Sequence, residues 1–435
     1  MLILIVFCIL AGFYYVDSEI AKKIFWFLGI SWGQEPYYDT FSPLSWLECH
    51  RQGIKVYYSN PCDTRLGMEM SYPPAWLAFS GFGIGTAHAV ILGTASGLAF
   101  CMSCMALPRP QTLAAAACLA LTLCSNAVLF GLHQGNFDLV VFAMAVLFVH
   151  AMQRPLGTRK AAYIGVIGLS ALKFYPLFLA ILVAREPLRW VLFLLGVVTM
   201  AALTYAASAP EELAATLAWM PRGRPLEMFG FGNAENGLRL LLDLPERHPG
   251  LAIAVTTAFF MATSMIGLHT ASLLVRIDAR TLLTPLERDF LVAGAALIVG
   301  CFLAGQNWRY KAIFLILAVV PLATLAGRAR LATARILFSA AVVAVLVALW
   351  GVFLINAAKH ADIALGLQRI TGIGLLRAIA WSLQEVAWWG VIGVLGGCLA
   401  WWATAQPAVL ALRRTASWSK LLPGTQSGYG RTDRP

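Results

Sequence analysis

Residues 336–355 read ILFSAAVVAVLVALWGVFLI, a continuous apolar run without a charged side chain. An α-helix needs about 20 such residues to cross the hydrocarbon core of a bilayer. Backbone amides in lipid must be bonded within their own segment, so we expect this run to be a transmembrane helix. The chain lacks the strand-like alternation of apolar and polar residues that is typical of an outer-membrane barrel. This run therefore predicts a helical membrane protein.

Comparable apolar runs recur along the 435 residues, of which 60% are hydrophobic and 12% are charged. A soluble domain is about 25% charged, so half of the usual polar surface is missing. The runs that we expect to span the membrane are 1–16, 84–106, 111–131, 137–153, 188–207, 251–275, 289–304, 310–327, 335–356 and 386–404. The predicted fold class is all-α, a multispanning integral membrane protein with large extracytoplasmic loops.

The basic residues are distributed unevenly between the loops. More than half of the 32 lysines and arginines, with few acids among them, fall near residues 109, 154–160, 185–189, 276–288 and 328–335 and in the tail. The positive-inside rule places these loops in the cytoplasm, and we expect the membrane to be a bacterial cytoplasmic (inner) membrane. The resulting division is a transmembrane domain over 1–407 with both termini cytoplasmic, external segments at 17–83, 208–250 and 357–385, and a basic cytoplasmic tail at 408–435.

The net charge of +11 does not indicate a nucleic-acid partner, because no basic stripe is interleaved with aromatic residues. The sequence contains no GxxxxGK[ST], HExxH, paired CxxC or GxSxG motif, so we predict neither a metal nor a cofactor. Cys101 and Cys104 form a single CxxC inside an apolar run, where cysteine packs as a small residue. Cys49 and Cys62 lie in a polar loop, and a disulfide is possible if that loop faces an oxidising space.

The apolar stretch 161–184 is interrupted near its middle by Lys173 and Pro176. Basic loops flank this stretch on both sides, so its two ends are expected on the same side of the membrane. A hairpin broken at 173–176 satisfies this, since irregular backbone at membrane depth is tolerated where protein or a water-filled cavity surrounds it. Lys173 would then either face a lipid phosphate or extend its ammonium to the interface.

The first external segment is rich in tyrosine, tryptophan and proline, and it carries seven acids between Asp17 and Glu69. Loops of this length are usually functional or disordered, and this composition argues against disorder. Aromatic rings beside carboxylates suit a sugar; the alternative is a belt of rings at the membrane interface. Asp39 is the leading candidate for a general base that accepts a proton from an acceptor hydroxyl. Asp17 is its rival, because it directly follows the first span.

Further polar clusters lie at the predicted outer ends of the spans. Asn136 and Asp138, in HQGNFD at 133–138, either line an acceptor pocket or cap the following helix. Arg239 ends a glycine-rich segment that begins at Gly230, and Arg309 and Lys311 follow Gly305. Glycine permits close approach of backbone to a ligand, and arginine is a fork-shaped phosphate partner. The alternative for both basic clusters is anchorage at lipid headgroups.

The order of these residues resembles that of the GT-C-fold glycosyltransferases, especially the polyprenyl-phosphate-mannose-dependent mannosyltransferases. Members typically carry an Asp in the first external loop, then a Gly followed by a Tyr, and then Tyr-Pro-Pro. The matching positions are Asp39, Gly53, Tyr57, Tyr72-Pro73-Pro74, Gly135-Asn136-Phe137-Asp138, Lys173 with Pro176, and Asn233-Ala234-Glu235-Asn236 with Arg239. The family's late external motif often contains His, where this chain has Asn307-Trp308-Arg309-Tyr310.

The resemblance implies a GT-C-like helical bundle and an inverting, metal-independent glycosyltransferase. The enzyme would move mannose or a similar hexose or pentose from a polyprenyl-phosphate donor to a lipid or glycan acceptor on the extracytoplasmic face. The implied roles are general base for Asp39, donor phosphate binding for Lys173, Arg239, Arg309 and Lys311, and acceptor or sugar binding for Tyr57, Tyr72, Asn136, Asp138 and Asn233. The alternatives are a transporter or flippase of lipid-linked sugars, in which broken helices also occur, and a polymerase or ligase of surface polysaccharide.

Overall fold

The structure is a computed structural model that describes residues 18–30, 36–218, 225–242, 249–367 and 373–415, together with Val6 and Gly12. Its helices and 3₁₀ segments are α2 (Ser18–Phe27), α3 (Tyr38–Arg51), η1 (Pro74–Phe82), η2 (Thr86–His88), α4 (Ala89–Cys104), α5 (Leu113–Leu123), α6 (Asn126–Gln134), α7 (Asp138–Met152), α8 (Leu156–Leu172), η3 (Tyr175–Arg185), α9 (Leu188–Ser208), α10 (Pro210–Ala218), α11 (Asn233–Leu242), α12 (Pro249–Arg276), α13 (Ala279–Leu282), α14 (Pro285–Ala304), η4 (Arg309–Leu315), α15 (Ile316–Arg328), α16 (Ala332–Ala364), α17 (Leu375–Ala403) and α18 (Pro407–Thr415). Two short strands, β1 (Met228–Phe229) and β2 (Asn307–Trp308), pair antiparallel.

The helices confirm the predicted all-α, multispanning class. Within the described ranges, six helices are long and apolar enough to cross a membrane, and the bent pair α5–α6 brings the number to seven. The predicted spans 137–153 and 289–304 are also helical, as α7 and α14. The predicted span 1–16 lies outside the described residues, apart from Val6 and Gly12.

The predicted span 111–131 differs from the structure in one respect, because it is not a single straight helix. α5 ends at Leu123, α6 begins at Asn126, and the two axes meet at 41°. The Asn126 side chain is buried and donates a hydrogen bond to the Leu28 carbonyl at the end of α2. A buried amide must find a partner, and this contact with a distant segment accompanies the bend.

The stretch 161–184 forms the predicted hairpin, with α8 as one arm and η3 as the other. Arg159 near the start of α8 binds both carboxylate oxygens of Glu186 after η3, at 2.7 and 2.9 Å. Pro176 supplies no amide hydrogen to an α-helical ladder, so the chain breaks here. The arms are long, since the 17 residues of α8 extend about 25 Å. The Trp76 indole in the first external segment donates to the Leu172 carbonyl at 2.9 Å, so the hairpin reaches the opposite end of the bundle.

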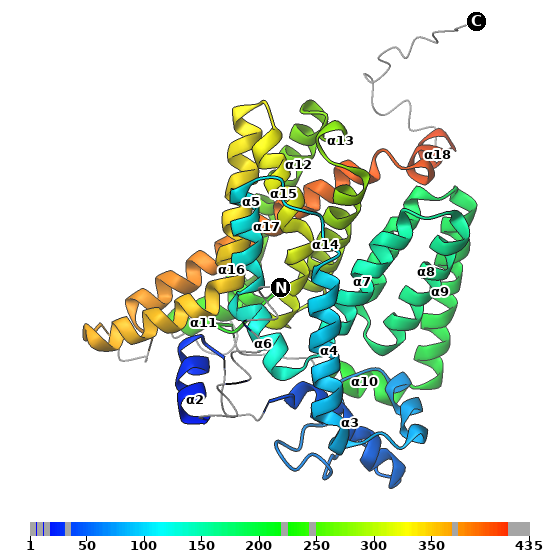
Figure 1. The fold of residues 1–435 in the computed structure, drawn as a ribbon, viewed down its shortest axis with the longest axis vertical. Helices are drawn as coiled ribbons and strands as arrows, with labels where there is room; N and C mark the ends of the chain where they lie inside the picture. The colour runs from blue at the N-terminus through cyan, green and yellow to red at the C-terminus, as the bar shows by residue number, and fades with distance from the viewer. Residues whose placement is uncertain are drawn as a thin grey trace, which may run out of the picture.

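The bundle therefore has two distinct ends (Figure 1). We call the end formed by α3, η1 and α10 the α3 end, and the opposite end, with α13, the α18 end. At the α18 end, Arg185 pairs with Asp289, which also accepts from Gln153. α7 connects the two ends, and its 15 residues separate them by about 22 Å.

The core lies where α14, α15, α16 and α17 pack together, with α7 and the hairpin against them. Large side chains fill it, including Phe290, Phe314 and Phe338, all fully buried. The rings of Phe229 and Trp388 stack at 4.0 Å between centroids, which attaches the two-stranded β1–β2 ladder to α17. This packing fixes the position of the segment 305–311 relative to the bundle.

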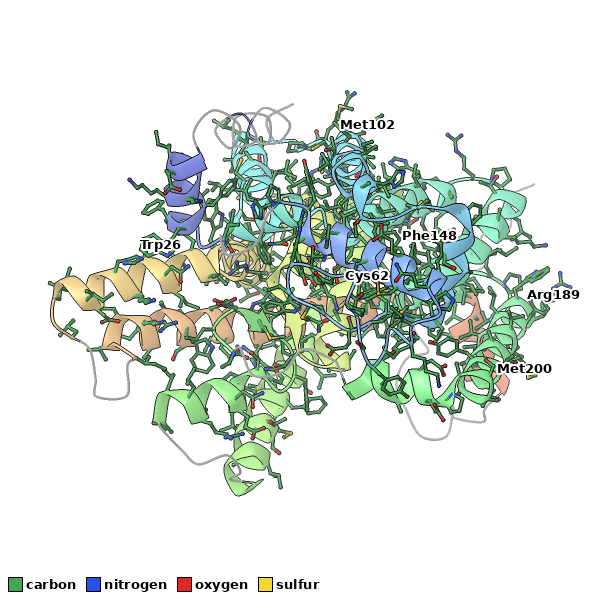
Figure 2. The ribbon with its side chains drawn as sticks, turned by 90° about the horizontal axis from the view of Figure 1, so that it is seen from below. Trp26, Cys62, Met102, Phe148, Arg189 and Met200 are labelled. Carbon is green, nitrogen blue, oxygen red and sulfur yellow. A yellow bond between two sulfur atoms is a disulfide. The ribbon has the colours of Figure 1, made fainter. Side chains whose placement is uncertain are left out.

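The segment 357–385, which we expected to be an external loop, is mostly helical. α16 continues to Ala364 and α17 begins at Leu375, so the pair projects as a long helical hairpin (Figures 1 and 2). Asp362 accepts hydrogen bonds from the backbone amides of Leu376 and Arg377 at 2.9 and 2.8 Å. This side chain satisfies the first amides of α17, which allows the helix to start early.

Within the predicted first external segment, residues 38–82 fold as a compact unit at the α3 end. A disulfide joins Cys49 at the end of α3 to Cys62, with a Cα–Cα distance of 5.7 Å (Figure 2). Beneath it, Val56, Tyr57 and Met70 are buried against α3. Disulfides persist in oxidising compartments; the external placement of the segment itself stays a prediction.

The orientation gives a labelling prediction. In spheroplasts, a Ser59→Cys variant at the exposed surface of the first segment should react with a membrane-impermeant maleimide. An Arg330→Cys variant, exposed between α15 and α16, should react only after permeabilisation. The parent chain measures the background from native cysteines. The reverse pattern would contradict the predicted sidedness.

Candidate active site

Asp39 lies in the first turn of α3, and the residues before it hold this turn in place. Tyr37 has a left-handed backbone (φ 63°, ψ 28°), an uncommon conformation for a residue other than glycine. Its amide donates to the His133 carbonyl at 2.8 Å, and its ring leaves no room for a Cβ at Gly93 or Gly135. The start of α3 is thereby clamped between α4 and the turn that joins α6 to α7.

The carboxylate of Asp39 is bound to this turn. Asn136 Nδ2 donates to Asp39 Oδ2 at 2.6 Å, and the Asn136 side-chain oxygen accepts from the Asp138 amide at 2.8 Å and from Lys173 Nζ at 3.3 Å. The contact with the Asp138 amide agrees with the capping interpretation, whereas a role of Asn136 in an acceptor pocket stays a prediction. The residue satisfies the amide at the start of α7, and it also connects Asp39 to Lys173.

Lys173 is buried, with 6% of its surface exposed, and it forms an ion pair with Asp138. The Tyr175 hydroxyl donates to the same Asp138 oxygen at 2.6 Å. The Tyr72 ring lies 4.8 Å from Lys173 Nζ, a distance at which a cation is attracted to a ring. Lys173 therefore does not extend to the interface, and it connects the hairpin tip to α7.

Lys311 adds a second cation beside this cluster. Its Nζ donates to the Asn307 side-chain oxygen at 2.7 Å and lies 5.2 Å from the centre of the Tyr175 ring. Arg309 points elsewhere: its guanidinium donates to the Gly29 carbonyl at 2.7 Å and lies 4.1 Å from the Phe130 ring. The two basic residues of this segment thus face different surroundings.

Asn233 and Arg239 lie on α11, further from Asp39 along the chain of contacts. Asn233 donates to Glu385 at 2.8 Å and accepts from Gln306 at 3.2 Å. Arg239 lies 3.9 Å from Glu235, one helical turn earlier. The β1–β2 ladder brings the segments 225–242 and 305–311 together, as Phe229 faces Asn307. Neither the helical periodicity of the sequence nor the spacing of its motifs predicted that these two segments lie together.

Tyr57 has a supporting position. Its ring is buried and its hydroxyl donates to the Tyr72 carbonyl at 2.9 Å, which fixes the backbone that carries the Tyr72 ring toward Lys173. The rival acid, Asp17, lies outside the described residues.

Sequence reasoning missed two residues of this region. Tyr175 lies only two positions after Lys173, and its place beside the proline break was the available signal. Glu385 is a single acid next to a long apolar run, and it is buried between Asn233 and the Trp389 indole. An acid at such a position is costly unless it is paired.

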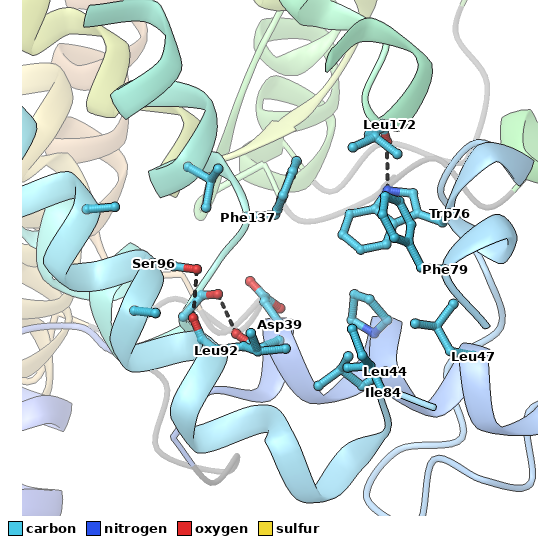
Figure 3. A pocket seen from close by; sticks show the side chains of 16 residues that line it. Asp39, Leu44, Leu47, Trp76, Phe79, Ile84, Leu92, Ser96, Phe137 and Leu172 are labelled. Atoms are coloured by element: carbon cyan, nitrogen blue, oxygen red, sulfur yellow. Dashed lines mark hydrogen bonds between the residues drawn. The ribbon is translucent and has the colours of Figure 1, made fainter. Parts of the chain in front are cut away.

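A cavity of about 370 Å³ opens beside Asp39 (Figure 3). Its wall comes from α3, η1, α4, the α6–α7 turn and the end of α8. The lining residues are Asp39, Thr40, Pro43, Leu44, Leu47, Trp76, Phe79, Ile84, Leu92, Ala95, Ser96, Ala99, Gly135, Phe137, Val140 and Leu172. Asp39 is the one ionisable side chain among these described lining residues.

Burial raises the pKa of Asp39 to about 6, because removal from water disfavours the charged carboxylate. The hydrogen bond from Asn136 and the charge of Lys173 act in the opposite direction and lower this pKa. A carboxyl group with a pKa near the working pH can both accept and release a proton. In the described part of the chain, no group of three or more His, Cys, Asp or Glu residues is placed to hold a metal ion.

No protein-family model matches the chain, and no curated protein matches it. Among solved structures, the chain is similar to ArnT from Cupriavidus metallidurans in the apo state, with 17% identity and a TM-score of 0.34 over 89% of this chain and 77% of that one. A likeness at this score carries no argument about activity.

The Lys173–Asp138 pair gives a stability prediction. A Lys173→Met variant leaves the Asp138 carboxylate buried without its cation, which typically costs about 3–5 kcal/mol. We expect a lower thermal midpoint for the purified protein in detergent. A Lys173→Met/Asp138→Asn double variant should recover part of the loss, because the unpaired charge is gone. Equal midpoints for the single and double variants would show that the unpaired Asp138 charge is not the cause of the loss, and a single variant as stable as the wild type would show that the pair contributes nothing.

Proposed function

We propose that the chain is a membrane glycosyltransferase that moves a sugar from a polyprenyl-phosphate donor to a lipid or glycan acceptor on the extracytoplasmic face. One observation supports it above the others. A carboxylate at the wall of a cavity, Asp39, is separated from the buried cation Lys173 by a single amide side chain, that of Asn136. A transferase of this kind needs a base for the acceptor and positive charge for the leaving phosphate.

In the proposed step, the acceptor hydroxyl oxygen attacks the anomeric carbon of the donor sugar. The bond between that carbon and the phosphate oxygen breaks, and its electron pair stays on the phosphate. The hydroxyl proton moves to Asp39, which later releases it to water. A single displacement of this kind inverts the anomeric centre, and the sugar is mannose or a similar hexose or pentose.

The developing charge on the phosphate requires fixed positive groups. Lys311 is the better placed, because its partner Asn307 is neutral. Lys173 contributes as well, although Asp138 offsets part of its charge. Arg239 and Arg309 are proposed to contact the phosphate when the donor is bound. In this structure Arg239 faces Glu235, and Arg309 faces the Gly29 carbonyl.

Acceptor and sugar contacts are proposed for the remaining polar groups of the site. Asn136 contacts both Asp39 and Lys173, the Tyr72 ring lies 4.8 Å from Lys173 Nζ, and Asp138 orients Lys173. Tyr57 acts through the backbone of Tyr72, and Asn233 through Gln306. The proposal needs no metal, because the lysines supply the positive charge.

A transporter of lipid-linked sugars is the competing class, since it also uses broken helices near the membrane centre. It would need polar groups along a path between both sides. The described polar groups of this site gather at the α3 end, and α7 separates them by about 22 Å from the ion pair Arg185–Asp289. This one-sided arrangement favours the transferase.

The Asp39→Asn variant tests the proposal. It keeps the shape of the side chain and removes the base, so transfer of labelled sugar from polyprenyl phosphate should fall about 10²–10⁴-fold. Glu69→Gln in the same segment is the matched control and should keep the wild-type rate, as should Asp17→Asn and addition of EDTA. Wild-type transfer by Asp39→Asn would refute the mechanism. Lipid scrambling in vesicles with no transfer would establish the transporter instead.

The pKa of Asp39 sets the expected pH dependence. The base must be ionised, so the transfer rate should rise with pH and reach half of its maximum near pH 6. An Asn136→Leu variant removes a hydrogen bond that lowers this pKa, and its midpoint should move to higher pH. Initial rates between pH 4.5 and 8.5 measure both curves. A rate independent of pH in this range would exclude Asp39 as the base.

A further inference from the structure

We propose that the cavity beside Asp39 holds the acceptor, and that this acceptor is an uncharged lipid with a free hydroxyl that enters sideways from the bilayer. The inference names the substrate class of the proposed transferase and therefore rests on the proposed function. It depends on the charge of the cavity wall, its position in the membrane and its relation to the lysines.

None of the described lining residues offers a positive charge to an anion. Among the described lining residues, Asp39 is the single ionisable side chain, and the hydroxyl-bearing ones are Thr40 and Ser96. Thr40 donates to the Gly135 carbonyl at 2.6 Å, and Ser96 donates to the Leu92 carbonyl at 2.8 Å. A phosphate or carboxylate headgroup would be buried here without a partner and beside a negative Asp39, which is unfavourable. A neutral hydroxyl is the polar group that fits.

The rest of the wall matches an apolar body. Rings of Trp76, Phe79 and Phe137 lie on one side, and aliphatic side chains of α4 lie on the other (Figure 3). The volume of about 370 Å³ falls within the range of about 300–1,000 Å³ that is usual for ligand sites. This space holds a hydroxyl-bearing head and the first part of an acyl or alkyl chain.

Exposed apolar side chains border the cavity on α4 and η1. α4 belongs to a membrane-length helical stretch, and Leu92, on its part near the α3 end, is both exposed and part of the cavity wall. On η1, Phe79 lines the cavity and is 37% exposed, and its neighbour Phe82 is 73% exposed. Exposed rings at the end of a membrane span are suited to the lipid interface. A lipid can therefore pass between α4 and η1 without leaving the membrane.

The cations of the site lie apart from this cavity. Lys173 directs its ammonium to Asn136 and Asp138, and Lys311 directs its own to Asn307; none of these five residues is among the described lining residues. The hydroxyl and the leaving phosphate thus have separate surroundings. Asp39 lies between them, because it faces the cavity and also binds Asn136.

The experiment uses the full-length protein in lipid vesicles and a long-chain alcohol that carries a photoactivatable group. After irradiation, mass spectrometry should find the label on peptides from α4 and η1. The corresponding alkyl sulfate, which is always anionic, should label these peptides at least about fivefold less, because its charge finds no partner in the cavity.

Two tryptophan variants of α4 supply the matched control. Ala99 lines the cavity, so Ala99→Trp should fill it and reduce labelling by the alcohol at least about fivefold. Leu98 is exposed on the neighbouring position and lies outside the cavity wall, so Leu98→Trp should leave labelling unchanged. Thermal midpoints confirm that both variants are folded.

Three results would overturn the inference: equal labelling by the alcohol and the sulfate, no effect of Ala99→Trp, or loss of labelling when polyprenyl phosphate is added. The last would mean that the cavity holds the donor chain. Labelling measures binding and needs no transfer. If the alcohol labels α4 and η1 as expected but the protein never transfers sugar, the proposed function is refuted and the binding of an uncharged lipid in the cavity is still supported.

Discussion

The buried amide of Asn136 is the group on which the candidate site depends. Its nitrogen orients the Asp39 carboxylate, and its oxygen receives the amide at the start of α7 and the ammonium of Lys173. No bulk water reaches a packed interior to satisfy these groups, so protein must do so. One side chain therefore sets the geometry of the acid, the cation and a core helix together.

The hairpin of α8 and η3 explains how a lysine comes to lie there. Arg159 and Glu186 join its two ends at the α18 end, and the Trp76 indole holds its tip at the α3 end. The Arg159–Glu186 ion pair thus lies where the hairpin begins and ends. Lys173, the charged residue near the hairpin tip, pairs with Asp138. An unpaired ammonium at this depth would cost at least a few kcal/mol.

The proposed chemistry depends on a separation of charge in the site. Asp39 faces an apolar cavity, and burial raises its pKa to about 6, a value that suits the proposed role of a base near neutral pH. Lys173 and Lys311 lie on the other side of Asn136 from the cavity, and they supply the positive charge proposed to bind the phosphate. A transfer reaction needs both surroundings within a few ångströms, because the proton and the leaving group depart from different atoms.

The sequence by itself determined the fold class, since apolar runs of membrane length without charge can only be helical in lipid. It also predicted the hairpin, because Lys173 and Pro176 interrupt a run between two basic loops. It singled out Asp39, Asn136, Asp138 and Lys173 but left their partners open. Only the tertiary structure decided that Lys173 pairs with Asp138 and that Arg309 turns to Gly29. Such pairs lie far apart in the chain, and packing rather than local pattern sets the direction of each side chain.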